Sequence, residues 1–502
     1  MTRRITRREA VLKAMLGAGA LALAGCGTGR APSSGSTLRS TWIDPLGNGQ
    51  LAIGPGEPLV DRVDLGPRAA ADAVLATLAH LTDAHVLDAS SPARVPFLDR
   101  LGPPFQSTFR PQEALTLQVL AGAVAAVARQ RPQLVIQGGD LIDNDQSNEL
   151  SHALAALDGG HVHPGSGPRG YYGVQSGFDP DPFYYRPEVD APQHPGLLRA
   201  AVRPLRSPGL GAPTYPVLGD HDVLVAGEIV PTALTRALAI GDRALWDLPR
   251  GLTVPRSELP HAGASPDGPP QPGPINDFLD RALEGPTVSV PSDPARREME
   301  FSEVIARLAR AAPGAVSGLG AGERLDYALD VGSRVRLIVL DLVRRGGGSG
   351  GLVSAHQPAW LERQLAAAGD RWVIVVSHQP LASSVGGELL LGLLDRHPRV
   401  IAALSGHVHH NRIVPRPSAA GGYWLITTSS LIDYPQQARA LRVVATAGGG
   451  VAIQTWMLDH AFPGTLGAIA RELAYLDAQG GRPTGARGTH LDRNVTLYRR
   501  AA

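Results

Sequence analysis

Aspartate and histidine residues gather in five short clusters along this chain of 502 residues, and each cluster follows an apolar run. In chain order the clusters are Asp83-Ala84-His85, Gly139-Asp140, Gly219-Asp220-His221-Asp222, Ser377-His378 and Gly406-His407-Val408-His409. Carboxylate oxygens and imidazole nitrogens together suit ions such as Mn, Fe and Zn. Two such ions close together can stabilise both the attacking and the leaving oxygen of a displacement at phosphorus. The residue types therefore predict a dinuclear metal centre that acts on a phosphate ester.

The apolar runs that precede the clusters are short and almost unbroken, which is typical of strands buried on both faces. We expect strands at residues 74–81, 134–136, 215–218, 335–340, 372–376 and 400–404. Helical patterns at residues 113–129 and 357–368 predict α/β layering. Ligands of such sheets bind beyond the carboxyl ends of the strands, where all five clusters stand. Residues 423–429, 440–445 and 451–458 predict an antiparallel finish, and residues 468–476 a closing helix.

The order D-x-H, G-D, G-[N/D]-H-D, H and G-H-x-H resembles the calcineurin-like metallophosphoesterase superfamily, over roughly residues 74–460. Each motif alone is weak, but the five in this order are specific. The resemblance implies an α/β fold, a four-layer α/β/β/α sandwich of two mixed sheets with long loop insertions. It also implies hydrolysis of a phosphate-ester substrate by two metal ions, Mn, Fe or Zn, and a bridging hydroxide. Monoesterase and diesterase activity both stay open.

The resemblance also assigns a role to each motif residue. Three residues would hold one metal: Asp83, His85 and His409. Three would hold the other: Asp220, His378 and His407. Asp140 would bridge the two metals. The family usually has Asn where this chain has Asp220, and the added negative charge would favour a trivalent ion.

The resemblance implies a catalytic role for His221, which matches the family histidine beside the scissile phosphate. There it would protonate the leaving oxygen or stabilise charge on the phosphoryl group. Asp222 would orient His221, because a ring nitrogen that faces a phosphate needs its other nitrogen fixed. Asp143 either supports the ligands from behind or caps a turn. The competing class is a non-catalytic binding lipoprotein that keeps the fold but not the chemistry.

Two gaps between the clusters are long enough to hold inserted structure, at about residues 145–212 and 224–332. The first gap concentrates aromatic residues in a chain that has only 5% of them. These rings either anchor the loop to the body or form a wall of the substrate pocket. The residues that would line such a pocket are Tyr171, Tyr172, Tyr184, Tyr185 and His410.

The two ends of the chain predict export and tethering. Residues 1–25 resemble a twin-arginine export signal with Arg7 and Arg8, and Leu23-Ala24-Gly25-Cys26 resembles a lipobox. Cys26 is the only cysteine, so we expect lipid attachment there and a place on the outer face of the cytoplasmic membrane; a cleaved signal and secretion is the alternative. We expect a flexible linker at 26–72, the metallophosphoesterase domain at 73–460, and a C-terminal helix and mobile tail at 461–502.

The charge balance indicates no nucleic-acid surface. Residues 1–25 hold five basic residues and one acidic residue, so their removal leaves 42 basic and 45 acidic residues, a net charge of −3.

Overall fold

The computed structural model describes residues 35–101, 108–178, 181, 183–245, 247–252, 274–312, 324–480 and 487–501. The predicted export signal and Cys26, the predicted site of lipid attachment, lie outside these ranges, so export and anchoring stay predictions. Within the described ranges, the helices are too short or too polar to span a bilayer.

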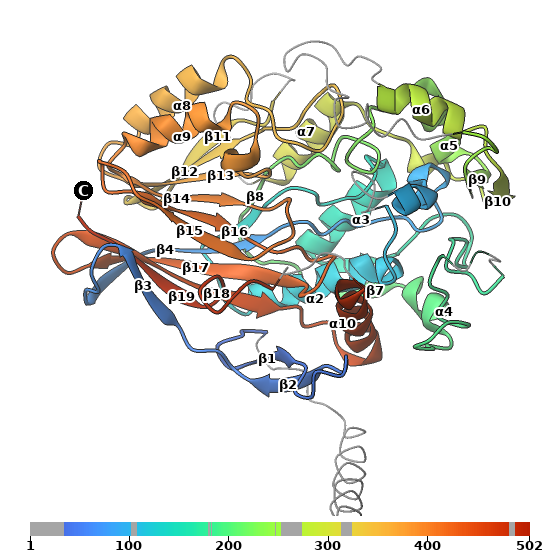
Figure 1. The fold of residues 1–502 in the computed structure, drawn as a ribbon, viewed down its shortest axis with the longest axis horizontal. Helices are drawn as coiled ribbons and strands as arrows, with labels where there is room; N and C mark the ends of the chain where they lie inside the picture. Colours follow the sequence, from blue (N-terminus) through green and yellow to red (C-terminus); the bar gives the residue numbers. More distant parts are fainter. Residues whose placement is uncertain are drawn as a thin grey trace, which may run out of the picture.

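Two mixed sheets lie one above the other at the centre of the molecule (Figure 1). The larger has the order β3-β19-β18-β17-β4-β5-β8, with bounds Val60–Leu65, Val495–Arg499, Gly450–Asp459, Gln437–Thr446, Ala71–Leu81, Leu134–Gln137 and Thr214–Pro216. The smaller has the order β11-β12-β13-β14-β16-β15, with bounds Tyr327–Val331, Val335–Leu340, Trp372–Ser377, Val400–Ser405, Tyr423–Thr427 and Arg412–Arg416. β4, β5 and β8 are parallel, as are β12, β13, β14 and β16, so each group brings its carboxyl ends to one edge.

Helices cover the outer faces of both sheets, which completes the predicted α/β/β/α sandwich (Figure 1). On the larger sheet lies α2 (Thr116–Ala128), against which α3 (Ser147–Asp158) and α10 (Gly464–Gln479) pack; on the smaller lie α8 (Gln357–Ala366) and α9 (Gly387–Asp395). β13 shows why its sequence is apolar without interruption. Ile374 belongs to the core between the sheets, whereas Val375 belongs to the core under α8 and α9.

The two long gaps contain secondary structure of their own. The first holds α3, α4 (Leu197–Ala201) and a small antiparallel sheet of β6 (Gly160–Val162) and β7 (Leu205–Ser207). The described residues of the second include α5 (Ala233–Ile240), α6 (Pro274–Ala282), α7 (Phe301–Ala311) and a small antiparallel sheet of β9 (Arg243–Leu245) and β10 (Thr287–Ser289). A separate apolar cluster that includes Phe97, Ile229 and Phe278 joins the second insertion to the loop after β4.

Two of the predicted boundaries are wrong. The predicted linker at 26–72 contains the antiparallel pair β1 (Ser40–Ile43) and β2 (Ala52–Pro55), and then β3. The predicted mobile tail at 461–502 begins with α10, as expected, but also contributes β19 to the interior of the larger sheet. β19 pairs in parallel with β3, more than 400 residues away, and neither strand carries a local signal for such a distant partner.

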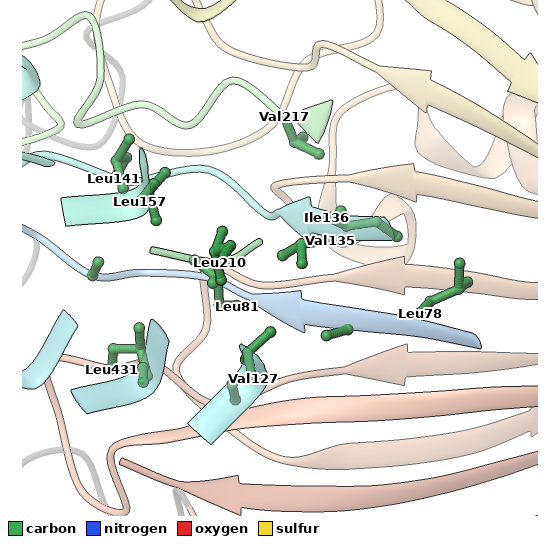
Figure 2. Packing of buried hydrophobic residues seen from close by; sticks show 14 of the residues in the cluster. Leu78, Leu81, Val127, Val135, Ile136, Leu141, Leu157, Leu210, Val217 and Leu431 are labelled. Atoms are coloured by element: carbon green, nitrogen blue, oxygen red, sulfur yellow. The ribbon is translucent and has the colours of Figure 1, made fainter. Parts of the chain in front are cut away.

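Leu81 tests how much the core of the larger sheet contributes to the stability of the fold. It is the last residue of β4, is fully buried, and belongs to the same cluster as Val135 and Ile136 (Figure 2). We expect Leu81→Ala to lower the free energy of unfolding by about 2–5 kcal/mol, because a cavity remains. Leu46 is 79% exposed, so Leu46→Ala should change it by less than about 0.5 kcal/mol. Chemical denaturation of both variants checks this; equal stabilities would contradict it.

Candidate metal centre

The predicted ligands converge where the carboxyl ends of the two sheets meet. The ligand atoms of four of them lie within 4.8 Å of one another: Asp140, Asp220, His378 and His407. The same holds for Asp83, His85 and His409. Asp140 lies between the two groups, since its Oδ2 is 3.0 Å from Nε2 of His378 and 3.7 Å from Nε2 of His85. The structure therefore brings all seven residues together in the grouping that the motifs predict.

Five of these seven residues have a left-handed backbone conformation, which residues other than glycine rarely adopt. Their φ angles are 53° at Asp83, 43° at His85, 49° at Asp140, 67° at His407 and 54° at His409. Such strain persists only where the surroundings hold it, and it is concentrated at functional sites. The tight turns aim successive side chains of each loop at one point, directly after the strand ends.

Glycines in the motifs allow the loops to approach closely. A Cβ at Gly219 would overlap the carboxylate of Asp140, and one at Gly406 would overlap Thr82 and the carboxylate of Asp83. The N–H of Asp83 donates to the carbonyl of Gly139 (3.0 Å), which fixes the first two loops side by side. The G-D-H-D and G-H-x-H motifs therefore need glycine because another loop fills the space of its side chain.

The electrostatics of the cluster favour a cation. Burial alone would lower the pKa of His378, but Asp140 and Asp220 raise it well above 6.5. Burial would raise the pKa of Asp220, but His407 and His378 hold it well below 3.8. Nε2 of His378 and Oδ2 of Asp220 are buried without a hydrogen-bond partner among the described residues. A buried nitrogen and a buried carboxylate oxygen without hydrogen-bond partners can both act as metal ligands. A bound metal would take the place of the protons that the histidines otherwise carry.

Hydrogen bonds from behind fix the orientation of three imidazoles. Nδ1 of His85 lies 3.0 Å from Oδ1 of Asp143, and Nδ1 of His378 lies 2.8 Å from the carbonyl oxygen of Gly138. Nδ1 of His409 lies 2.6 Å from Oδ2 of Asp433. In each case Nε2, the other ring nitrogen, lies close to other predicted ligand atoms, as metal-binding histidines require. Asp143 thus has the supporting role rather than the turn-capping role.

The expected contact between Asp222 and His221 is absent, which corrects the predicted role of Asp222. Nδ1 of His221 instead lies 2.9 Å from the carbonyl oxygen of Asp143 and 3.4 Å from its Oδ1. Burial would lower the pKa of His221, but Asp140 and Asp143 raise it to about 10. Consecutive side chains leave the backbone in different directions, so the neighbour in sequence does not reach the ring.

Asp222 instead organises the loop of Asp140. Its Oδ2 accepts hydrogen bonds from the backbone N–H groups of Gly219 (2.9 Å) and Asp140 (3.0 Å). Its Oδ1 accepts from the N–H of Leu141 (2.8 Å) and more weakly from Ile142 (3.3 Å). Asp222 is fully buried. Its carboxylate accepts hydrogen bonds from backbone N–H groups that would otherwise be unpaired near the end of β5. Asp222 therefore positions the predicted bridging ligand.

The aromatic residues of the first insertion largely anchor it to the body. Tyr184 is fully buried and packs edge-on against Phe109, with ring centroids 5.1 Å apart, so it does not line an open pocket as predicted. The hydroxyl of Tyr185 donates to the carbonyl of Pro192 within the insertion. Tyr172 lines a cavity of about 30 Å³ with Arg94 and Leu245.

Tyr171 and His410 are partly buried. The Tyr171 hydroxyl accepts from the N–H of Gln175 (3.3 Å), and Nδ1 of His410 lies 2.6 Å from the carbonyl oxygen of Val408. For Tyr171, Tyr172, Tyr185 and His410 a part in substrate binding stays a prediction.

Two polar residues at the centre were not expected from the sequence. Nε2 of Gln379 donates to Oδ1 of Asp220 (2.9 Å), and Asp433 contacts His409. Gln379 directly follows a ligand, and Asp433 stands a few residues beyond the end of β16. The rule that polar residues after buried strands form the site would have included both.

Comparisons with known proteins give only distant likenesses. No family model matches the chain, and no curated protein matches it significantly. Among solved structures, a dimetal phosphatase from Danio rerio is similar at 13% identity, covering 77% of this chain and 100% of the other, with a TM-score of 0.38. The structure of PhoD is similar at 10% identity, covering 86% of this chain and 80% of that one, with a TM-score of 0.36. Likeness at this level assigns no activity.

Asp220 is the predicted ligand that departs from the pattern of the family that the motifs resemble, and Asp220→Asn tests its charge. The carboxylate lies 3.2 Å from Nδ1 of His407 and 3.3 Å from Nε2 of His378. The two side chains have nearly the same shape, so we expect the variant to fold. One charge close to a metal in a partly dry site corresponds to on the order of several kcal/mol, reduced by solvent. The variant should therefore lose preference for Fe³⁺ over Mn²⁺ and Zn²⁺.

Competitive metal binding by both proteins measures this preference. Asp459→Asn is the matched control, because Asp459 is buried and bonded to Thr41 and Gln437 outside the cluster. Identical metal selectivity in wild type and Asp220→Asn would mean that Asp220 does not bind metal as a carboxylate.

Proposed function

We propose that this protein is a metal-dependent phosphoesterase of the calcineurin-like metallophosphoesterase type. The observation that carries the proposal is one buried carboxylate, Asp140, between two groups of histidine and aspartate ligands. Such an arrangement holds two metal ions near each other, and the ligand set suits Mn, Fe or Zn. Bound metals would activate a water for attack and withdraw negative charge from the phosphoryl group.

The chain's own residues would contribute orientation and proton transfer. The carbonyl and carboxylate of Asp143 hold Nδ1 of His221, so Nε2 is the ring nitrogen left for a substrate. The N–H of His221 donates to Oδ1 of Asp140 (2.9 Å), which ties the histidine to the metal centre. Gly227 approaches this ring so closely that a Cβ there would overlap Nε2 of His221 and Oδ2 of Asp220, so the loop beside the proposed proton donor needs glycine at this position.

Hydrolysis assays with metal removal test the proposal. We expect the purified protein to bind about two transition-metal ions and to hydrolyse aryl phosphomonoesters, phosphodiesters or both. Chelation should abolish turnover, and Mn, Fe or Zn should restore it. Activity that survives removal of all metal would contradict the proposal. Two bound metals without turnover on any member of the substrate panel would instead support the binding-protein alternative.

His221→Ala tests the proton donor. We expect the variant to keep both metals and to lose roughly 10²–10⁴-fold in kcat on alkyl phosphates, which need a protonated leaving oxygen. The loss should be smaller for nitrophenyl phosphates, whose leaving groups need no proton. His161 is exposed on β6, so His161→Ala serves as the control and should leave both rates unchanged. Equal losses on both substrate types would argue against a general acid at this position.

A further inference from the structure

We propose that the first insertion acts as a support for one metal site, through a chain of contacts that runs from its aromatic residues to Phe109, Arg110, Asp433 and His409. The inference rests on the proposed metal centre and assigns Asp433 and Arg110 as positioning residues. It also assigns the first insertion a structural role that does not depend on contact with substrate.

The first link joins Asp433 to the ligand. Asp433 is 2% exposed, and its Oδ2 accepts a hydrogen bond from Nδ1 of His409 at 2.6 Å. A proton on Nδ1 leaves Nε2 of His409 free as a ligand atom. That Nε2 lies 3.2 Å from Oδ1 of Asp83 and 3.3 Å from Nε2 of His85, the two partners predicted to share its metal. The position of the Asp433 carboxylate therefore sets both the orientation and the tautomer of this ligand.

The second link fixes Asp433 itself. Nε of Arg110 donates to Oδ1 of Asp433 (2.7 Å), and Nη2 donates to Oδ2 (3.3 Å). Arg110 is 3% exposed, so this two-point contact lies in a buried environment where it is strong and directional. The backbone N–H of Arg110 donates to Oε2 of Glu113 (3.1 Å), whose carboxylate also binds the buried Arg94. Arg110 thus projects from a rigid turn.

The third link connects that turn to the insertion. Phe109, next to Arg110, is buried against Tyr184 and Phe183, with ring centroids 5.1 Å and 6.0 Å away. Nε2 of Gln175 donates to the carbonyl of Pro111 (2.8 Å) and to that of Tyr185 (3.1 Å). The insertion therefore holds the turn on both sides of Arg110. Without these contacts the turn would lose the packing that fixes its guanidinium.

The links reach one metal site and not the other. His378 is held instead by the carbonyl of Gly138, a contact that involves neither Arg110 nor Asp433. A loosened His409 should therefore weaken the metal of Asp83 and His85 and leave the metal of Asp220 and His378 in place. This selectivity separates a positioning role from a general loss of stability, which would weaken both sites.

Metal-binding isotherms of Asp433→Asn test the link nearest the metal. We expect the dissociation constant of one of two Zn²⁺ ions to rise about 10–100-fold, with the other unchanged. The matched control is Asp395→Asn, because Arg416 binds Asp395 through the same two nitrogens at 2.8 Å on the outside of the smaller sheet. That control should bind both ions as the wild type does. Unchanged binding of both ions by Asp433→Asn would overturn the proposal.

Phe109→Leu tests whether contacts with the first insertion affect the affinity of this metal site. It also provides a second test if Asp433→Asn fails to fold. We expect the same ion to weaken by about 2- to 30-fold, the range of coupling through packed contacts. Phe278→Leu is the control, because Phe278 is equally buried but belongs to the second insertion. Equal effects of the two substitutions, or none from Phe109→Leu, would overturn the role of the insertion. A wild type that binds no metal would instead defeat the proposed function itself.

Discussion

Three buried aspartates, Asp83, Asp140 and Asp220, share one small volume at the edge where the two sheets meet. Carboxylates in a region of low dielectric repel one another and lose their hydration, so the arrangement is stable only with nearby positive charge. Imidazoles that follow strands of the smaller sheet supply contacts of 3.0–3.3 Å to these oxygens. The left-handed turns, the glycines between loops and the buried hydrogen bonds behind the ligands all serve to hold this concentration of charge in place.

The sequence predicts which Asp and His residues come together at this edge because the place of each is coded locally. A buried strand ends, and the polar residues directly after it reach the site; in three of the five clusters a glycine allows the tight turn between them. The smaller sheet follows the same logic, and β12 occupies the predicted residues 335–340. Strands whose partners lie far away carry no such signal. β3 and β19 form one edge region of the larger sheet from opposite ends of the chain, and sequence composition alone made them look like a linker and a tail.

The supporting residues were harder to predict than the ligands, because proximity in sequence is a poor guide to proximity around a turn. Asp222 follows His221 directly but binds four backbone N–H groups on the loops of Asp140 and Gly219. Asp143, 78 residues before His221, is the residue that holds the ring. A buried carboxylate is most stable where it accepts hydrogen bonds from several otherwise unpaired donors. At the end of β5 those donors are backbone N–H groups. Only the fold shows which donors are unpaired.

The two insertions meet the centre from different sides. The first contacts the turn that carries Arg110, and buried contacts lead from that turn to His409. The second begins directly after Asp222, and its Gly227 lies over the ring of His221. The next residue, Glu228, accepts hydrogen bonds from the backbone of Gly348 (2.8 Å) and Ser349 (3.2 Å). A loop that lies over the free nitrogen of His221 must limit the shape of any group bound there. Under the proposed metal support, the first insertion would influence metal binding and the second would limit the shape of the bound group, so the two would act on different properties of the same centre.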